Sequence, residues 1–359
     1  MPRIHNFSAG PGVLPLDVLQ ETRASILELN SSGLGLLECS HRSALYGEVI
    51  HSARTRLRAL LNLDEDQEVL FLHGGAQSQF FMVPMNFLQN QRAAYLDTGR
   101  WSELAIGEAQ RFGTVDVLYS SREDGYNGIP KPQHYEVHPD TVYLHYTSNN
   151  TVAGTQFHHI PTTSNGFLVC DASSDILSRP FDGSRFGLIY AGAQKNMGPA
   201  GVTLVIIRKS LLSACDENLP TMLKYGVHVA KESMNNTPNT FGIYVIDQVC
   251  QWIENNGGLS AMEQRNRSQA EKLYAAIDDS DFYQGKAKVE ARSWMNVTFT
   301  TNDPELDTLF WKTAEKQGMS GLKGHRVVGG LRASIYNAQT DEAVNALLAF
   351  MKEFERTRG

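Results

Sequence analysis

Cysteine is scarce in this chain, and its thiols are not arranged in pairs. The sequence has 4 cysteines among 359 residues, and none belongs to a C-x-x-C motif. A zinc site or a redox dithiol is therefore disfavoured. We expect free thiols and no bound metal.

Long hydrophobic runs and targeting segments are also missing. No apolar stretch approaches the ~18 residues of a membrane helix, and the N-terminal MPRIHNFSAGPG lacks the apolar core of a signal peptide. With 32 Lys and Arg against 39 Asp and Glu, the formal charge of −7 does not favour nucleic acid or an anionic membrane. We therefore expect a cytoplasmic protein that binds neither, in which any anionic ligand needs a local cluster of Arg and His.

Strand and helix signals alternate through most of the sequence. The composition, 42% hydrophobic and 20% charged, is ordinary for a globular protein, and the length suits two domains or one large one. The alternation predicts an α/β fold with a mainly parallel sheet flanked by helices. The predicted strands are 69–75, 93–99, 141–149, 166–173, 186–193 and 201–208.

The pattern changes near residues 255–258, where Asn-Asn-Gly-Gly interrupts it. Beyond this point we predict a smaller α+β domain. Its expected elements are a helix at 259–278, a strand at 293–301, a helix at 307–317, a strand at 330–336 and a last helix from Thr340. The chain is accordingly divided into an N-terminal segment (1–15), a large domain (16–258) and a small C-terminal domain (259–359).

Lys195 lies in a Gly-rich segment, AGAQKNMGPAG, directly after a predicted strand. It is either an exposed turn residue or a lysine that forms a Schiff base, a role that needs a lowered amine pKa. Asp171 ends the neighbouring predicted strand and favours the second interpretation. Pyridoxal phosphate requires both a lysine for its aldehyde and a carboxylate facing its pyridinium nitrogen. Taken alone, Asp171 would also suit a helix N-cap, because Ala-Ser-Ser follows it.

Three further segments follow predicted strands. The segment HGGAQSQF (73–80) matches neither a P-loop nor G-x-G-x-x-G, which disfavours a nicotinamide dehydrogenase. Its small residues could present backbone N–H groups to a phosphate, or simply form a tight turn. Trp101 could stack on a flat cofactor or belong to the core. Thr151 could hydrogen-bond a phenolic oxygen or serve a turn.

Two basic clusters remain, Ser40–Ser43 (SHRS) and Lys323–Arg332 (KGHRVVGGLR). Arginine matches carboxylate and phosphate with paired hydrogen bonds, and histidine adds a donor. A single His-Arg pair is usually a surface feature. Two such pairs in Gly-rich settings of an acidic chain indicate small anionic substrates.

Taken together, these segments resemble the phosphoserine aminotransferase family of fold-type I pyridoxal-phosphate enzymes. The lysine segment and the C-terminal GHRVVGGLRAS are specific to that family. The resemblance implies a large domain with a seven-stranded type of sheet and a smaller C-terminal domain. It extends almost from end to end, through NFSAGP (6–11), SHRS (40–43), Gly-Gly-x-x-x-Gln-Phe (74–80), ILSRP (176–180), IYAGAQKNMGPAG (189–201), NTP (236–238) and KGHRVVGGLRASIYNA (323–338).

The resemblance implies a role for each central residue. Lys195 would be the Schiff-base lysine and Asp171 the partner of the pyridine nitrogen. Trp101 would stack on the cofactor, and Thr151 would bond its phenolic oxygen.

The anionic groups would be held by residues from two subunits of a homodimer with shared active sites. The cofactor phosphate would contact Ala76, Gln77 and Gln194, together with Asn236 and Thr237 of the other subunit. Gln77 stands where some members have an arginine that helps to bind substrate phosphate.

The substrate itself would be held by the basic clusters. Arg332 would bind the α-carboxylate, while the distal phosphate or the glutamate side chain would meet His41, Arg42, His325 and Arg326.

The implied activity is the reversible transamination of 3-phosphohydroxypyruvate with L-glutamate, giving O-phospho-L-serine and 2-oxoglutarate for serine biosynthesis. Some family members also act on 4-phosphohydroxythreonine in pyridoxine biosynthesis, and the sequence leaves both substrates open. Two alternatives stay open beside this one. An aminotransferase or lyase for another small anionic amino acid would share the fold, and a non-catalytic cofactor-binding module would share the lysine segment.

Overall fold

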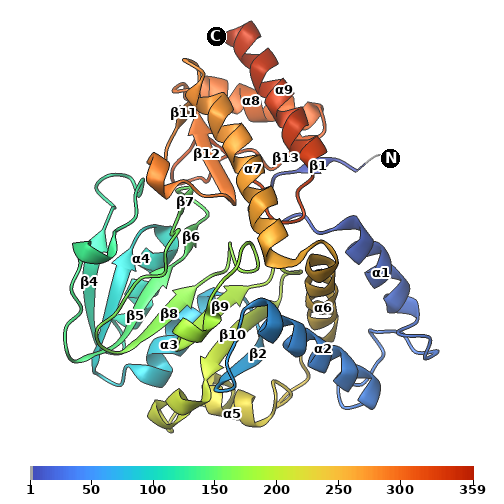
Figure 1. Ribbon diagram of the computed structural model, residues 1–359, viewed down its shortest axis with the longest axis vertical. Helices are drawn as coiled ribbons and strands as arrows, with labels where there is room; N and C mark the ends of the chain where they lie inside the picture. Colours follow the sequence, from blue (N-terminus) through green and yellow to red (C-terminus); the bar gives the residue numbers. More distant parts are fainter. Residues whose placement is uncertain (1–2) are drawn as a thin grey trace.

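The computed structural model describes residues 3–359 and has a central sheet with helices on both faces (Figure 1). In this part of the chain the sheet has seven strands in the order β2-β10-β9-β8-β5-β3-β4. The α/β prediction is confirmed. The strands are β2 (Gln67–His73), β3 (Arg92–Asp97), β4 (Thr114–Ser120), β5 (Thr141–Thr147), β8 (Phe167–Asp171), β9 (Leu188–Gly192) and β10 (Val202–Arg208).

Strand direction brings most of the loops to one edge of the sheet. The neighbours from β9 to β4 pair in parallel, whereas β10 is antiparallel to both β9 and β2. Since β2 and β9 both oppose β10, they point the same way. Six strands therefore end at the same edge.

The predicted strands match the observed ones to within a few residues, but β4 was missed. It is an edge strand with no fully buried position, so neither a continuous apolar run nor a strict alternation marks it in the sequence. Because β4 pairs with only one neighbouring strand, its side chains are partly or fully exposed and need not be apolar.

Alternate residues of each strand pack against opposite helical layers. Phe71 of β2 and Ile189 of β9 lie in the core that includes α1, α2 and α6 residues, whereas Leu72 and Tyr190 lie in the core that includes α3 and α4. The helices are α1 (Leu16–Leu27), α2 (Ala44–Leu60), α3 (Gln77–Phe87), α4 (Arg100–Ala109), α5 (Tyr225–Ala230), α6 (Thr240–Asn255), α7 (Gly258–Asp278), α8 (Pro304–Lys316) and α9 (Asp341–Arg358).

Side-chain caps fix several helix starts. Thr340 accepts a hydrogen bond from the Ala343 N–H at the start of α9, where the helix was predicted to begin. The prediction for α8 began three residues late. Asp303 caps that helix through the Glu305 N–H, with Pro304 at its first position.

The C-terminal part of the chain has a core of its own, above the main sheet in Figure 1. Its sheet has the order β11-β12-β14, and β13 pairs with the N-terminal strand β1. We propose to treat residues 16–258 and 259–359 as two domains, with α7 passing from one core to the other. The short strands are β1 (His5–Asn6), β6 (Asn149–Asn150), β7 (Thr155–Gln156), β11 (Gln284–Gly285), β12 (Asn296–Thr300), β13 (Met319–Ser320) and β14 (Leu331–Ser334).

The four cysteines are all free in the structure. No helix within residues 3–359 is both long and apolar enough to cross a membrane. The same residues contain no group of three or more His, Cys, Asp or Glu side chains placed to hold a metal ion.

The N-terminal segment should stabilise the small domain through Phe7, which is 0% exposed in that domain's core. Replacing it with Ala should lower the free energy of unfolding by about 3 kcal/mol, because the cavity would be only partly refilled. Ile4→Ala is the control, since Ile4 is 57% exposed. Denaturant unfolding followed by tryptophan fluorescence measures both, and equal effects of the two variants would contradict the assignment.

Candidate active site

The common strand edge brings four predicted segments around one cavity of about 260 Å³. Asp171 is the last residue of β8, and Lys195 follows β9. Gly75–Gln77 follow β2, and Trp101 lies in the first turn of α4, after β3. The cavity is lined by Gly75, Ala76, Gln77, Ser78, Phe80, Trp101, Asp171, Ser173, Gln194 and Lys195.

The Lys195 amine sits deep in this cavity between a hydroxyl and an aromatic ring. Its Nζ donates to Thr151 Oγ1 at 2.6 Å and lies 5.5 Å from the centre of the Trp101 ring. Burial lowers the pKa of Lys195 to about 8; Asp171 opposes this shift, and Arg332 adds to it. At pH ~7 about a tenth of the amine is therefore neutral, far more than for an ordinary lysine, and the neutral form is the nucleophile.

The turn that carries Lys195 is held from several sides. Asn196 donates to Ile176 O and accepts from the Asn337 N–H of the small domain. The Gly12 N–H donates to Gln194 O at 2.8 Å. A Cβ atom at Gly12 would lie 2.3 Å from Lys195 O, so the N-terminal segment approaches as closely as glycine allows.

The Asp171 carboxylate is buried beside the same cavity. It accepts hydrogen bonds from the Ser173 N–H at 3.0 Å and the Ser173 hydroxyl at 2.5 Å. Burial raises the pKa of Asp171, while the Ser173 hydrogen bonds and Lys195 lower it. Residues 173–177 form a turn and not a helix, so Asp171 is not a helix N-cap.

Ser173 is a site residue that the sequence reasoning missed. Its hydroxyl donates to Asp171 and accepts from the Gly192 N–H at 3.1 Å, which ties together the ends of β8 and β9. The Asp-x-Ser spacing was the available signal, because aspartate commonly bonds the backbone two residues ahead.

The remaining wall offers several free polar groups. Ala76 and Gln77, at the start of α3, line the cavity, and this helix start has no side-chain cap. Backbone N–H groups at such a helix start can bind an anion. Within the described residues, Gln194 Oε1 and Trp101 Nε1 are buried and have no hydrogen-bond partner. An amine, a buried carboxylate, a flat indole and an uncapped helix start together fit a planar phosphorylated aldehyde such as pyridoxal phosphate.

Arg332 joins this site from β14 of the small domain. Its Nη1 donates to Thr151 O at 3.1 Å, and its Nε has no partner in residues 3–359. Burial lowers the pKa of His325, and Arg332, Arg326 and Arg100 lower it further, which indicates a concentrated positive field. His325 and Arg326 line a second cavity of about 600 Å³ in the small domain.

Eight predicted residues do not line the Lys195 cavity. Thr151 bonds Lys195 and Arg332 bonds Thr151, while His325 and Arg326 line the second cavity. The other four lie elsewhere in their own chain: His41, Arg42, Asn236 and Thr237. Arg42 is exposed, and buried His41 Nε2 has no partner in the described part of the chain. Asn236 is partly exposed, and Thr237 O accepts from His73 Nε2 at 2.8 Å. The expected partner-subunit role of Asn236 and Thr237, and the expected substrate contact of His41 and Arg42, stay predictions.

A model of the aminotransferase class-V family matches residues 4–347, so the chain belongs to the class-V aminotransferases. It is 50% identical over 360 residues to a phosphoserine aminotransferase of Desulfatibacillum aliphaticivorans, covering 99% of each. The chain therefore belongs, within this class, to the phosphoserine aminotransferase family.

Solved structures agree with this assignment. The phosphoserine aminotransferase of Bacillus circulans subsp. alkalophilus superposes with a TM-score of 0.97 at 48% identity, covering 99% of both chains. A pyridoxal-phosphate-bound phosphoserine aminotransferase of Trichomonas vaginalis gives 0.92 at 37% identity, covering 98% of this chain and 100% of that one.

The lowered pKa of Lys195 should be visible in the stability of the cofactor-free protein. The unfolded chain keeps its Lys195 proton up to pH ~10.4, so it binds more protons than the folded state between pH ~8 and ~10.4. Stability relative to Lys195→Met should therefore rise with pH, by about 2 kcal/mol from pH ~7.5 to ~9.5. Urea unfolding at both pH values measures it, and a constant difference would show that the pKa is not lowered.

Proposed function

We propose that this protein is a pyridoxal-phosphate-dependent phosphoserine aminotransferase. It exchanges the amino group of L-glutamate with 3-phosphohydroxypyruvate, giving O-phospho-L-serine and 2-oxoglutarate. One observation carries the proposal: the Lys195 amine, the Asp171 carboxylate and the uncapped start of α3 face a single cavity. The proposal places this activity in the cytoplasm, in keeping with four free thiols.

Bound pyridoxal phosphate would supply an electron sink that stabilises a carbanion at the substrate Cα. Asp171 would hold the proton on the pyridine nitrogen, and Trp101 would cover one face of the ring. The N–H groups beside Ala76 and Gln77 would hold the phosphate. Lys195 would accept and return the Cα proton, which its near-neutral pKa suits.

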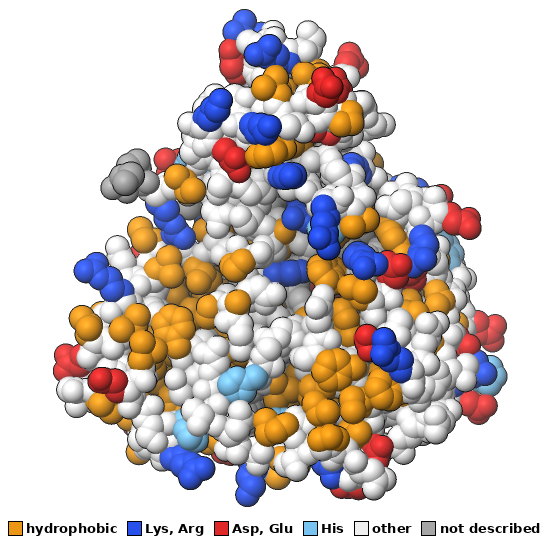
Figure 2. Space-filling model, turned by 180° about the vertical axis from the view of Figure 1, so that it is seen from behind, with side chains coloured by type: hydrophobic (Ala, Val, Ile, Leu, Met, Phe, Trp, Pro, Cys, Tyr) orange, Lys and Arg blue, Asp and Glu red, His pale blue; other side chains and the backbone are white. Residues whose placement is uncertain are grey.

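The substrate's anionic groups would be held by the small domain. Arg332 would offer the α-carboxylate its Nε, which has no partner among residues 3–359, and His325 and Arg326 lie nearby for the distal phosphate. Figure 2, which draws one face of the molecule, shows Lys and Arg side chains around the junction of its upper and lower parts. The compound 4-phosphohydroxythreonine presents the same two anionic groups, and we include it as a second substrate.

We also propose a homodimer in which each site is completed by the partner. Leu27 and Leu37 are 81% and 60% exposed on and beside α1. Figure 2 shows hydrophobic side chains gathered toward the side where α1 lies. Apolar patches of this kind commonly mark interfaces. His41, Arg42, Asn236 and Thr237 would enter the partner's cavity in such a dimer.

The substrate assignment predicts a selective optical response. Phosphoserine and glutamate should each bleach the visible band of the holoprotein, whereas serine, which has no side-chain anion, should not. Spectrophotometric titration measures all three. A band that responds to serine but not to phosphoserine would favour the alternative aminotransferase, and no band after adding pyridoxal phosphate would favour neither enzyme.

A steady-state assay of transamination should identify the catalytic lysine. Lys195→Ala should lower turnover by at least ~10³-fold, since both the covalent link and the proton transfer are lost. Lys352→Ala, at an exposed lysine of α9, should keep turnover unchanged. Near-normal activity of Lys195→Ala would remove it from this role.

Shared sites predict complementation between inactive subunits. A Lys195→Ala protein mixed with an Asn236→Ala/Thr237→Val protein should form hybrid dimers with one intact site each. After subunit exchange at equal amounts, about a quarter of the sites should be active. Sedimentation should show a dimer throughout, and no recovery of activity in a mixed dimer would refute the shared site.

A further inference from the structure

Thr151 lies in a short hairpin formed by residues 148–157, here named the Thr151 hairpin. Its strands β6 and β7 pair antiparallel, with Asn150 opposite Thr155. The hairpin carries the hydroxyl that accepts from Lys195 Nζ. Its position therefore sets one of the close contacts of the reactive amine.

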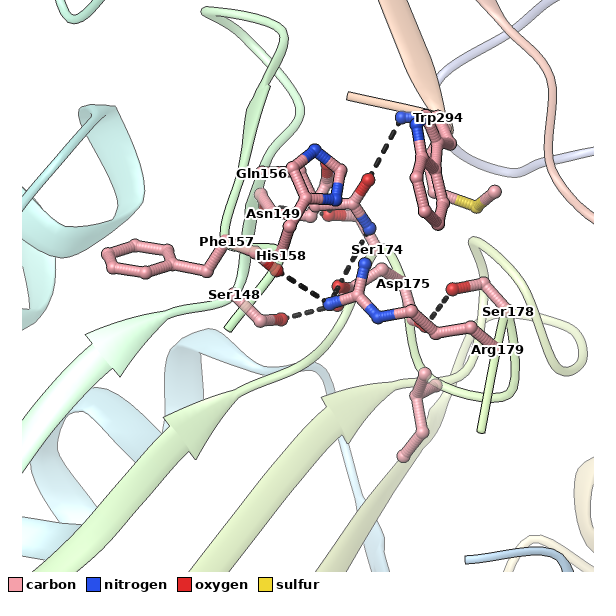
Figure 3. Close-up of polar contacts among 12 residues, drawn as sticks. Ser148, Asn149, Gln156, Phe157, His158, Ser174, Asp175, Ser178, Arg179 and Trp294 are labelled. Atoms are coloured by element: carbon pink, nitrogen blue, oxygen red, sulfur yellow. Dashed lines mark hydrogen bonds and ion pairs between the residues drawn. The ribbon is translucent and has the colours of Figure 1, made fainter. Parts of the chain in front are cut away.

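The base of the Thr151 hairpin is held by the large domain (Figure 3). The Asp175 carboxylate accepts from the Ser148 hydroxyl and, at 3.1 Å, from Gln156 Nε2. Arg179 pairs with Asp175 and donates to Phe157 O at 2.7 Å. Both ends of the hairpin are thus fixed by one buried ion pair.

The tip of the hairpin is held by the small domain, which also bonds the base through Asn149 and Gln156. The Thr298 hydroxyl donates to Ala153 O at 2.8 Å, and the Ser293 N–H donates to Gly154 O at 2.9 Å. Arg332 Nη1 donates to Thr151 O. Because Thr298 pairs directly with Arg332 across β12 and β14, one strand pair positions both the hairpin tip and the substrate-binding arginine.

The contact between tip and strand is too close for a side chain. Gly154 has a φ of +78°, and a Cβ there would lie 2.4 Å from Thr298 Oγ1 and 2.9 Å from Asn296 O. The tip therefore rests on β12 with its backbone against the Thr298 side chain. Because Gly154 and Thr151 are three positions apart in the same hairpin, we expect a small displacement of this contact to move Thr151 as well.

We propose that Thr298 is a positioning residue, which seats the tip of the Thr151 hairpin and thereby sets the hydrogen bond between Thr151 and Lys195. The inference rests on the proposed function, because it assigns Thr298 a role in tuning the amine that would bond the cofactor. Thr298 is 4% exposed and touches the amine only through the hairpin.

The readout is the pH dependence of the rate at which pyridoxal phosphate binds the cofactor-free full chain, followed by visible absorbance. That rate depends on the neutral fraction of the amine. The charged groups that act on Lys195 are Asp171, Asp175 and Arg332. Thr298→Val replaces none of them. Because Thr298 also lies opposite Arg332, the double variant with Thr151→Val shows whether a shifted midpoint acts through the hairpin contact.

A hydroxyl oxygen that accepts from Nζ favours the protonated amine. Thr151→Val should therefore lower the midpoint, by about 0.5–1 pH unit. Thr298→Val should shift it in the same direction by a smaller amount. The double variant should match Thr151→Val alone, because both changes act through one hydrogen bond.

Two controls separate positioning from general destabilisation. Thr298→Ser keeps the hydroxyl and should keep the wild-type midpoint. Thr300→Val removes a threonine hydroxyl from the same strand, one that donates to Asp307 at 2.8 Å rather than to the hairpin, and should also leave the midpoint unchanged.

The outcomes distinguish this inference from the proposed function. An unshifted midpoint in Thr298→Val, or a shift that adds fully to that of Thr151→Val, overturns the positioning role while cofactor binding stands. Shifts of equal size in Thr298→Val and Thr300→Val also overturn it. Failure of the wild-type chain to bind pyridoxal phosphate at any pH overturns the proposed function and, with it, this inference.

Discussion

The shared direction of six strands is the constraint on which the site depends. Parallel neighbours need a crossover connection that brings the chain back to the same starting edge, and here helices cover both faces of the sheet. β10 is the one reversed strand of this sheet. Because β2 and β9 are both antiparallel to β10, they point the same way. The loop that leads from β2 into α3 therefore reaches the same edge as Asp171 and Lys195.

At that edge, electrostatics decides what the residues can do. Lys195 loses solvation in the cavity, and the nearby Asp171 does not fully restore its ordinary pKa. Arg332 approaches from the small domain and adds positive potential. The site thus keeps a reactive amine among anion-binding groups, a combination that suits a phosphorylated cofactor and an anionic substrate.

Much of this could be predicted from the sequence, because buried parallel strands leave continuous apolar runs and Gly-rich turns. These patterns predicted where the strands end, and they placed Lys195 and Asp171 at the ends of two predicted strands. Other features were not. β4 lies at an edge and carries no apolar run, and Ser173 acts through a bond to a neighbouring strand. The contact between Gly154 and Thr298 joins residues that are 144 positions apart in the sequence, and no local sequence pattern indicates it. Where His41, Arg42, Asn236 and Thr237 act stays a prediction, since it depends on a second subunit.

The measurement that tests the central claim most directly is chemical. The holoprotein would be reduced with borohydride, digested and mapped by mass spectrometry, which locates the lysine bonded to the cofactor. The account predicts a phosphopyridoxyl group on Lys195 and on no other lysine. A label on a different lysine, or none on a protein saturated with pyridoxal phosphate, would contradict it.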